Sequence, residues 1–229
     1  MKLKILLIGF ILISCHTFSQ EKENLFSMIE QDQKQIELLP EKFNRSAWSK
    51  LLGFAERYNE PGVFSALIGF EWTSMIDGDN LHRVVVYRDG MTKAQNMLPF
   101  SALDSPDPED LWKFMGKYEK STGGQVIAIP HNGNVSNGVM FSDKRVDGSD
   151  FNKTYTELRQ RWEPLYEVTQ VKGDAEAHPY LSPNDEYANF ETWDQGNLRM
   201  EPKEKNMLQG EYARSALKNG LALSQKFGV

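Results

Sequence analysis

The stretch VFSALIGFEWTS, residues 63–74, marks the point at which the character of this 229-residue chain changes. It is rich in β-branched and aromatic residues, which favours a mostly buried strand, whereas the residues before it have helical spacing. Its one carboxylate, Glu71, interrupts the apolar run at a position that the strand would bury. A buried carboxylate is costly unless it is paired or bound to a metal. The stretch therefore predicts a strand and raises the question of what Glu71 binds.

Strands and helices alternate after this stretch. Three further strands are predicted, over residues 81–90, 125–131 and 164–173. Helices are predicted over residues 105–124, 150–162 and 203–228. Such alternation favours an α/β fold with a largely parallel sheet, in which functional residues gather where the strands end.

Composition and charge indicate a globular protein and limit the kinds of molecule that it is expected to bind. Hydrophobic residues make up 40% of the chain and charged residues 25%, which fits one globular domain with a core. The net charge is -6, and Lys and Arg form no long block, which argues against nucleic acid as a partner. A small anionic substrate stays compatible with this charge, because a metal ion or a few local cations could hold it.

Residues 1–20 have the pattern of an export signal. Two lysines precede the apolar run ILLIGFILIS, residues 5–14, which is too short for an ordinary membrane span. The motif Leu12-Ile13-Ser14-Cys15 resembles a bacterial lipobox, in which Cys15 becomes the lipidated first residue of the mature protein. The alternative is a simple secretory signal cleaved after residues 18–20. Either pattern predicts a protein outside the cytoplasm, periplasmic or on the outer surface if lipid-anchored and otherwise secreted.

Residues 21–60 predict a helical segment ahead of the α/β part. A first helix over residues 24–39 would end at Pro40, and a second would begin with Ser46 as its N-cap and stop before Pro61. The expected organisation is therefore a signal at 1–20, a helical segment at 21–60 and an α/β domain at 61–229.

Three histidines of the α/β part lie at or just beyond strand boundaries: His82, His131 and His178. Imidazole and carboxylate ligands without a thiolate suit Zn, Mn or Fe. The alternative is that each histidine is a packed, hydrogen-bonded residue, and that Glu71 pairs with Arg83 or Arg88. The spacing of these residues leaves both interpretations open.

Three blocks of sequence carry a family resemblance. They are FSALIGFEWTS with NLHRVVVYRDG (residues 64–74 and 80–90), IPHNGNVSNGVMF (129–141) and RWEPLYEVTQVKGDAEAHPYLSPNDEYANFE (161–191). These blocks resemble a family of secreted bacterial proteins within the PHP (polymerase and histidinol phosphatase) superfamily, over roughly residues 55–228. The resemblance implies a distorted (β/α)7 barrel, a cluster of Zn, Mn or Fe ions and hydrolysis of phosphate esters.

The resemblance also implies roles for single residues. Glu71, His82 and His131 would be metal ligands, with Glu71 bridging ions and with Glu71 and His131 taking part in catalysis. Substrate-binding residues would lie near the same edge of the sheet: Asn132, Asn134, Lys172, Glu176 and His178. Lys172 or Arg83 would neutralise an anionic oxygen of the substrate, unless each is simply a solvated charge.

The chain departs from the superfamily pattern at both ends. It contains no His-x-His motif and no final Asp-x-His motif. The resemblance therefore covers only the middle of a barrel and implies an incomplete (β/α)7 barrel with N-terminal helices. The expected function is that of an exported fragment of a metal-dependent hydrolase acting on a small phosphate ester, with at most one divalent ion and little turnover alone. The alternative is a non-catalytic surface lipoprotein that binds a small polar ligand at the Asn-rich loop.

Overall fold

A computed structural model describes residues 40–229 of the chain. The chain divides into two compact units, Met1–Phe43 and Asn44–Val229, and the second holds every strand within the described residues. The predicted export signal with Cys15 and the predicted helix over residues 24–39 lie outside the described residues.

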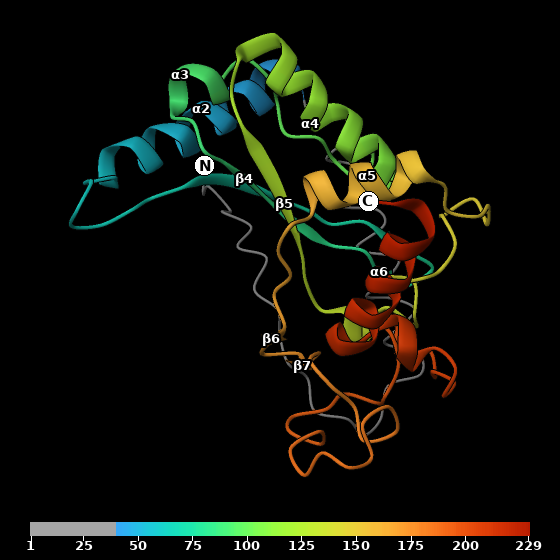
Figure 1. Cartoon of the computed structure of the whole chain (residues 1–229). Coiled ribbons are helices and arrows are strands. Elements are labelled where there is room, and N and C mark those ends of the chain that lie inside the picture. The colour runs from blue at the N-terminus through green and yellow to red at the C-terminus, as the bar shows by residue number, and fades with distance from the viewer. Residues whose placement is uncertain (1–39) are drawn as a thin grey trace. The chain divides into compact units, whose positions relative to one another are not determined.

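A three-stranded sheet lies at the centre of the second unit (Figure 1). It consists of β1 (Ile68–Trp72), β4 (Arg83–Tyr87) and β5 (Val126–Pro130), in the order β1-β4-β5. Both neighbouring pairs are antiparallel. Successive side chains of a strand point to opposite faces. One face consequently carries the buried residues of the core, and the other is free to carry polar side chains.

Helices cover the core face of this sheet. Helix α2 (Glu41–Tyr58), α4 (Pro108–Thr122) and α5 (Lys153–Trp162) each place a tryptophan in one hydrophobic core: Trp48, Trp112 and Trp162. A short helix, α3 (Met91–Ala94), precedes α4. Helix α4 lies within the predicted residues 105–124 and is bounded by a capping residue at each end. The Asp107 side chain accepts a hydrogen bond from Glu109 N at 2.8 Å, and Gly123 ends the helix with φ 63°.

The sheet is antiparallel, so the expectation of a largely parallel sheet is wrong. Between β1 and β4 the chain forms only a small hairpin, β2 (Met75–Ile76) and β3 (Asp79–Asn80). A connection this short returns the next strand antiparallel. Between β4 and β5, residues 88–107 and α4 together bring the chain back to the end of the sheet where β4 finished, as the antiparallel register requires.

One parallel contact does occur beside β5. Glu167 forms an isolated parallel bridge with His131, and Glu167 N donates to Pro130 O at 3.1 Å. The strand predicted over residues 164–173 is otherwise a small hairpin of β6 (Thr169–Gln170) and β7 (Gly173–Asp174). The incomplete (β/α)7 barrel stays a prediction.

Two predicted helix boundaries differ from the structure. Helix α2 begins at Glu41, directly after Pro40, so Ser46 lies inside the helix rather than at its N-cap. The helix predicted over residues 203–228 is only α6 (Ala213–Phe227), preceded by a 3-10 turn, η2 (Leu208–Gly210). The backbone at Gly210 lies against the Gly138 carbonyl, where a Cβ would clash. The Gly210 carbonyl accepts from Phe141 N at 2.9 Å and Ala213 N donates to Ala175 O at 2.8 Å, so these groups do not continue a helical ladder.

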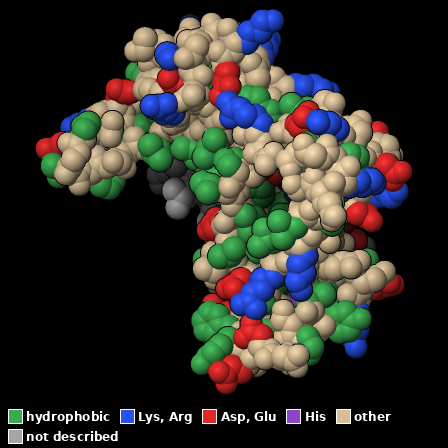
Figure 2. All heavy atoms as spheres, viewed as in Figure 1, with side chains coloured by type: hydrophobic (Ala, Val, Ile, Leu, Met, Phe, Trp, Pro, Cys, Tyr) green, Lys and Arg blue, Asp and Glu red, His purple; other side chains and the backbone are tan. Residues whose placement is uncertain are grey.

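One face of the described part carries side chains of both signs of charge (Figure 2). On the face in Figure 2, Lys and Arg side chains are interspersed with Asp and Glu side chains. Such a mixed surface matches the absence of a basic block from the sequence. Within residues 40–229, none of the helices combines the length and the apolar character needed to cross a membrane.

Candidate metal centre

The face of the sheet opposite the core carries the candidate site. Glu71 of β1 pairs with Val84 of β4, and Val84 pairs with Ile129 of β5. Residues two apart along an extended chain share a face. His82 lies two residues before Val84, and His131 lies two residues after Ile129. The antiparallel register therefore places both histidines on the face of Glu71, at one end of the sheet.

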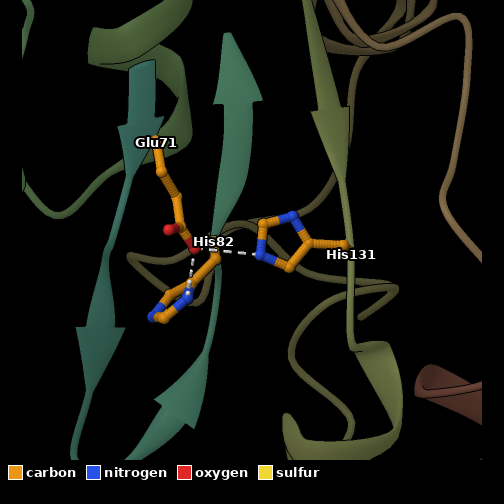
Figure 3. Close-up of side chains that lie close together, drawn as sticks. All are labelled: Glu71, His82 and His131. Atoms are coloured by element: carbon orange, nitrogen blue, oxygen red, sulfur yellow. Dashed lines mark hydrogen bonds and ion pairs between the residues drawn. The ribbon is translucent and has the colours of Figure 1, made fainter. Parts of the chain in front are cut away.

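Figure 3 shows how these three side chains point toward one another. Glu71 Oε1 lies 3.1 Å from His82 Nδ1 and 3.1 Å from His131 Nε2. The ligand atoms of the three residues all lie within 4.8 Å of one another. The two histidines are buried, at 7% and 3% exposed, whereas the Glu71 side chain is 41% exposed. The predicted convergence of these residues is thus confirmed in geometry, and one side of the cluster is open to solvent.

Electrostatics keep the cluster in a form suited to cation binding. The hydrogen bond from His131, and after it the one from His82, has the largest effect on Glu71. Together they hold the pKa of the Glu71 carboxyl well below its usual range, so the carboxylate is ionised. Burial lowers the pKa of His82, although Glu71 opposes this shift. A neutral imidazole can turn the lone pair of one ring nitrogen toward a cation once that nitrogen no longer donates to Glu71, and an ionised carboxylate supplies negative charge.

The donors fit a divalent transition metal in type and number. Two imidazoles and one carboxylate match a three-ligand site that leaves a position for water. The surroundings of His131 Nδ1 are less suited to metal binding. His131 Nδ1 is buried and has no hydrogen-bond partner within the described residues. A ring bound to a metal through Nε2 carries its proton on Nδ1, and metal-bound histidines normally donate that proton to an acceptor. The site therefore fits an ion, with weak affinity expected.

Arg83 and Arg88 do not pair with Glu71, although the sequence left that possibility open. Arg83 points to the core face, where its Nε donates to Glu163 Oε1 at 3.0 Å. Its side chain is 2% exposed and that of Glu163 3%. Arg88 donates instead to Gln125. Arg83 is therefore a structural residue, and the expectation that it neutralises an anionic substrate oxygen is wrong.

Three predicted substrate-binding residues gather beside the cluster. Lys172 Nζ donates to Asn132 Oδ1 at 3.2 Å and to Gln170 Oε1 at 2.9 Å. Asn134 Nδ2 donates to Lys172 O at 2.8 Å. Burial lowers the pKa of the Lys172 amine, and the nearby carboxylates of Glu71 and Glu167 oppose this shift. Lys172 thus lies within electrostatic range of the site carboxylate.

Glu176 and His178 have partners of their own away from the cluster. The Arg214 guanidinium donates to Glu176 Oε1 at 3.0 and 2.7 Å. His178 Nε2 lies 2.8 Å from Asp194 Oδ1, and His178 Nδ1 accepts from Tyr180 N at 3.0 Å. Both ring nitrogens of His178 are therefore engaged, and it does not belong to the three-residue cluster. A role of either residue in substrate binding stays a prediction.

Sequence reasoning missed Asn80. Its side chain is buried, and Nδ2 donates to the carbonyl oxygens of both His131 and Asn132. A lone Asn beside a turn carries no local signal of such a role, because its partners are some fifty residues away. Only the tertiary structure brings them together.

Comparisons with known proteins place the chain in a different family from the one that its sequence blocks resemble. A family model described as "Protein of unknown function (DUF3604)" matches residues 12–229. No curated protein and no solved structure matches the chain. The assignment to the PHP superfamily is therefore wrong, because the match is to this other family. A bridging role of Glu71 within a cluster of several ions rested on that assignment alone and loses its support.

Proposed function

Because the chain belongs to the family of proteins of unknown function (DUF3604), we propose its function from the site itself: a hydrolase that depends on one divalent metal ion and acts on a small phosphate ester. The observation that carries this proposal is the convergence of one carboxylate and two imidazoles within 4.8 Å at an end of the sheet. Zn, Mn and Fe all suit this donor set.

Each residue has a distinct part in this proposal. Glu71, His82 and His131 would hold the ion. When bound, such an ion lowers the pKa of a coordinated water and polarises the ester. Lys172 would bind an anionic oxygen of the substrate, because its amine lies beside Asn132 and Gln170 and within electrostatic range of Glu71. The partly exposed side of Glu71 leaves the substrate a route to the cluster.

The proposed location is outside the cytoplasm. The export pattern of residues 1–20 supports this part of the proposal, and Cys15 would carry a lipid anchor to the membrane. Labelling of expressing cells with a radioactive fatty acid tests it. The label should enter the wild-type protein and be absent from Cys15→Ala, whereas an unlabelled, exported wild type would favour simple secretion.

Metal titration of the purified protein tests the central proposal. We expect about one Zn²⁺ or Mn²⁺ per chain, bound with an affinity that falls at least about tenfold in His82→Ala and in His131→Ala. His178→Ala is the matched control, since this buried histidine lies outside the cluster and its loss should leave metal affinity unchanged. Hydrolysis of p-nitrophenyl phosphate should be slow, metal-dependent and lost in His131→Ala.

Two results would contradict the proposal. A wild-type protein that takes up no divalent metal would exclude the metal-dependent function. Binding of a polar small molecule that needs no metal and survives His131→Ala would favour the non-catalytic lipoprotein instead.

A further inference from the structure

We infer that Asn80 is a positioning residue of this site, whose buried amide fixes the backbone that presents His131. Asn80 is 1% exposed. Its Nδ2 donates to His131 O at 2.7 Å and to Asn132 O at 3.0 Å. The inference rests on the proposed function, because His131 is one of the proposed ligands. It adds a residue that touches neither the ion nor the substrate.

The backbone at His131 needs such support because the strand ladder ends beside it. The last register pair of β4 and β5 is Arg83 with Pro130, and proline has no N–H to donate. The next backbone hydrogen bond, from His131 N to His82 O, is long at 3.4 Å. Asn132 then turns the chain with φ 52° in the left-handed region. The carbonyls of His131 and Asn132 therefore have no ladder partner from β4. The Asn132 carbonyl also accepts from Val135 N at 3.2 Å, and the amide of Asn80 supplies the donor for the His131 carbonyl.

The same amide connects the segments that carry the two histidines. Asn80 belongs to β3 and precedes His82 by two residues. Its hairpin is itself fixed, because Asn197 Nδ2 donates to Asp79 Oδ1 at 2.7 Å and to Asp77 O at 3.2 Å. A displacement of Asn80 would change the separation between His82 and His131, and with it the fit of both rings to the Glu71 oxygen.

An amide is suited to this position in a way that its nearest replacements are not. The Asn NH₂ group has two protons, one for each carbonyl. Asp at position 80 would place an oxygen against two carbonyl oxygens, and Ala would leave both carbonyls without this donor. Partners that orient metal-bound histidines commonly change metal affinity about 10–100-fold when they are lost. We expect a loss of that size for Asn80→Ala and for Asn80→Asp.

The test uses Co²⁺ as the probe on the full-length protein. Affinity and the visible absorption spectrum of bound Co²⁺ are measured for wild type, Asn80→Ala, Asn80→Asp and the control Asn152→Ala. Asn152 accepts from Tyr155 N at 2.9 Å as the N-cap of α5, so its loss lowers the melting temperature without touching the site. Weaker binding with an altered spectrum in both Asn80 variants, and unchanged binding in the control, supports the inference.

A second readout separates this inference from the proposed function. Nitrogen NMR of the His131 ring reports whether Nε2 still donates to Glu71 in metal-free protein. If wild type binds no Co²⁺, the proposed function fails, and loss of this ring hydrogen bond in Asn80→Ala still supports the positioning role. Unchanged Co²⁺ binding and an unchanged ring signal in both Asn80 variants would overturn the positioning role of Asn80. If these variants do not fold, Asn80→Ser, which keeps one donor, replaces them under the same criteria.

Discussion

His131 Nε2 lies 3.1 Å from Glu71 Oε1, although sixty residues separate them in the chain. The same carboxylate oxygen lies at the same distance from His82 Nδ1. One oxygen atom therefore aligns both rings. A cation that enters the cluster has to displace both hydrogen bonds, and this competition, together with the unpartnered Nδ1 of His131, argues for weak metal binding.

Replacing Glu71 by Gln separates its role as a hydrogen-bond acceptor for the two histidines from its role as an anionic metal ligand. The amide oxygen of Gln can still accept hydrogen bonds from the two rings, but it has no negative charge for a cation. We expect Glu71→Gln to remain folded and to lose at least about tenfold in Zn²⁺ affinity, measured by calorimetry. Glu119→Gln, which removes a carboxylate from the surface pair with Arg161, is the control and should bind like wild type. Equal affinities for wild type and Glu71→Gln would remove Glu71 from the ligand set.

The buried pair of Arg83 and Glu163 should dominate stability on the core face. Arg83→Met leaves the Glu163 carboxylate buried with its closest charged partner gone, which costs about 3–5 kcal/mol in the free energy of unfolding. Lys113→Met, which breaks an exposed pair with Asp110, should cost no more than about 1 kcal/mol. Urea denaturation measures both. Similar values for the two variants would show that the Arg83 pair contributes no more than a surface pair.

Stability should fall in acid partly because of Glu163. Burial alone would raise the pKa of this carboxyl, but Arg83 and Arg159 together hold it below the ordinary value of 4.5. A lowered folded-state pKa contributes stability that is present above the unfolded-state pKa and lost as pH falls through the folded value. The difference in unfolding free energy between wild type and Glu163→Gln should therefore shrink below pH 4.5. A difference that stays constant from pH 7 to about pH 3 would contradict this assignment.

Two glycines should respond oppositely to replacement by alanine. A Cβ at Gly133, in the loop after His131, would clash with the Glu211 carbonyl and lie 2.8 Å from the Tyr166 hydroxyl. Gly133→Ala should cost about 1–3 kcal/mol of stability and weaken metal binding. A Cβ at Gly220 in α6 meets nothing within 4 Å, so Gly220→Ala should stabilise by about 0.5–1 kcal/mol. Thermal denaturation compares the stabilities of the two variants. A Gly133→Ala variant as stable as wild type would show that the loop moves to accommodate the added Cβ.

Much of the local structure could be predicted from the sequence because its signals are local. The apolar run up to Trp72 and the segment after Gln125 form strands as expected, and Asp107 and Gly123 bound α4 as capping rules predict. The sequence also identified Glu71 as a polar residue that needed partners. Strand-end histidines are few in this chain, so His82 and His131 were natural candidates.

The tertiary structure alone decided which of these residues meet. Strand direction depends on the path of the connections, and here that path makes the sheet antiparallel. That register, with the period of two along each strand, sends His82 toward Glu71 and the adjacent Arg83 to the opposite face toward Glu163. The role of Asn80 likewise depends on a contact with residues some fifty positions away. Periodicity and capping determine an element from its own residues, whereas partners across a sheet are determined by register and burial, which no single segment encodes.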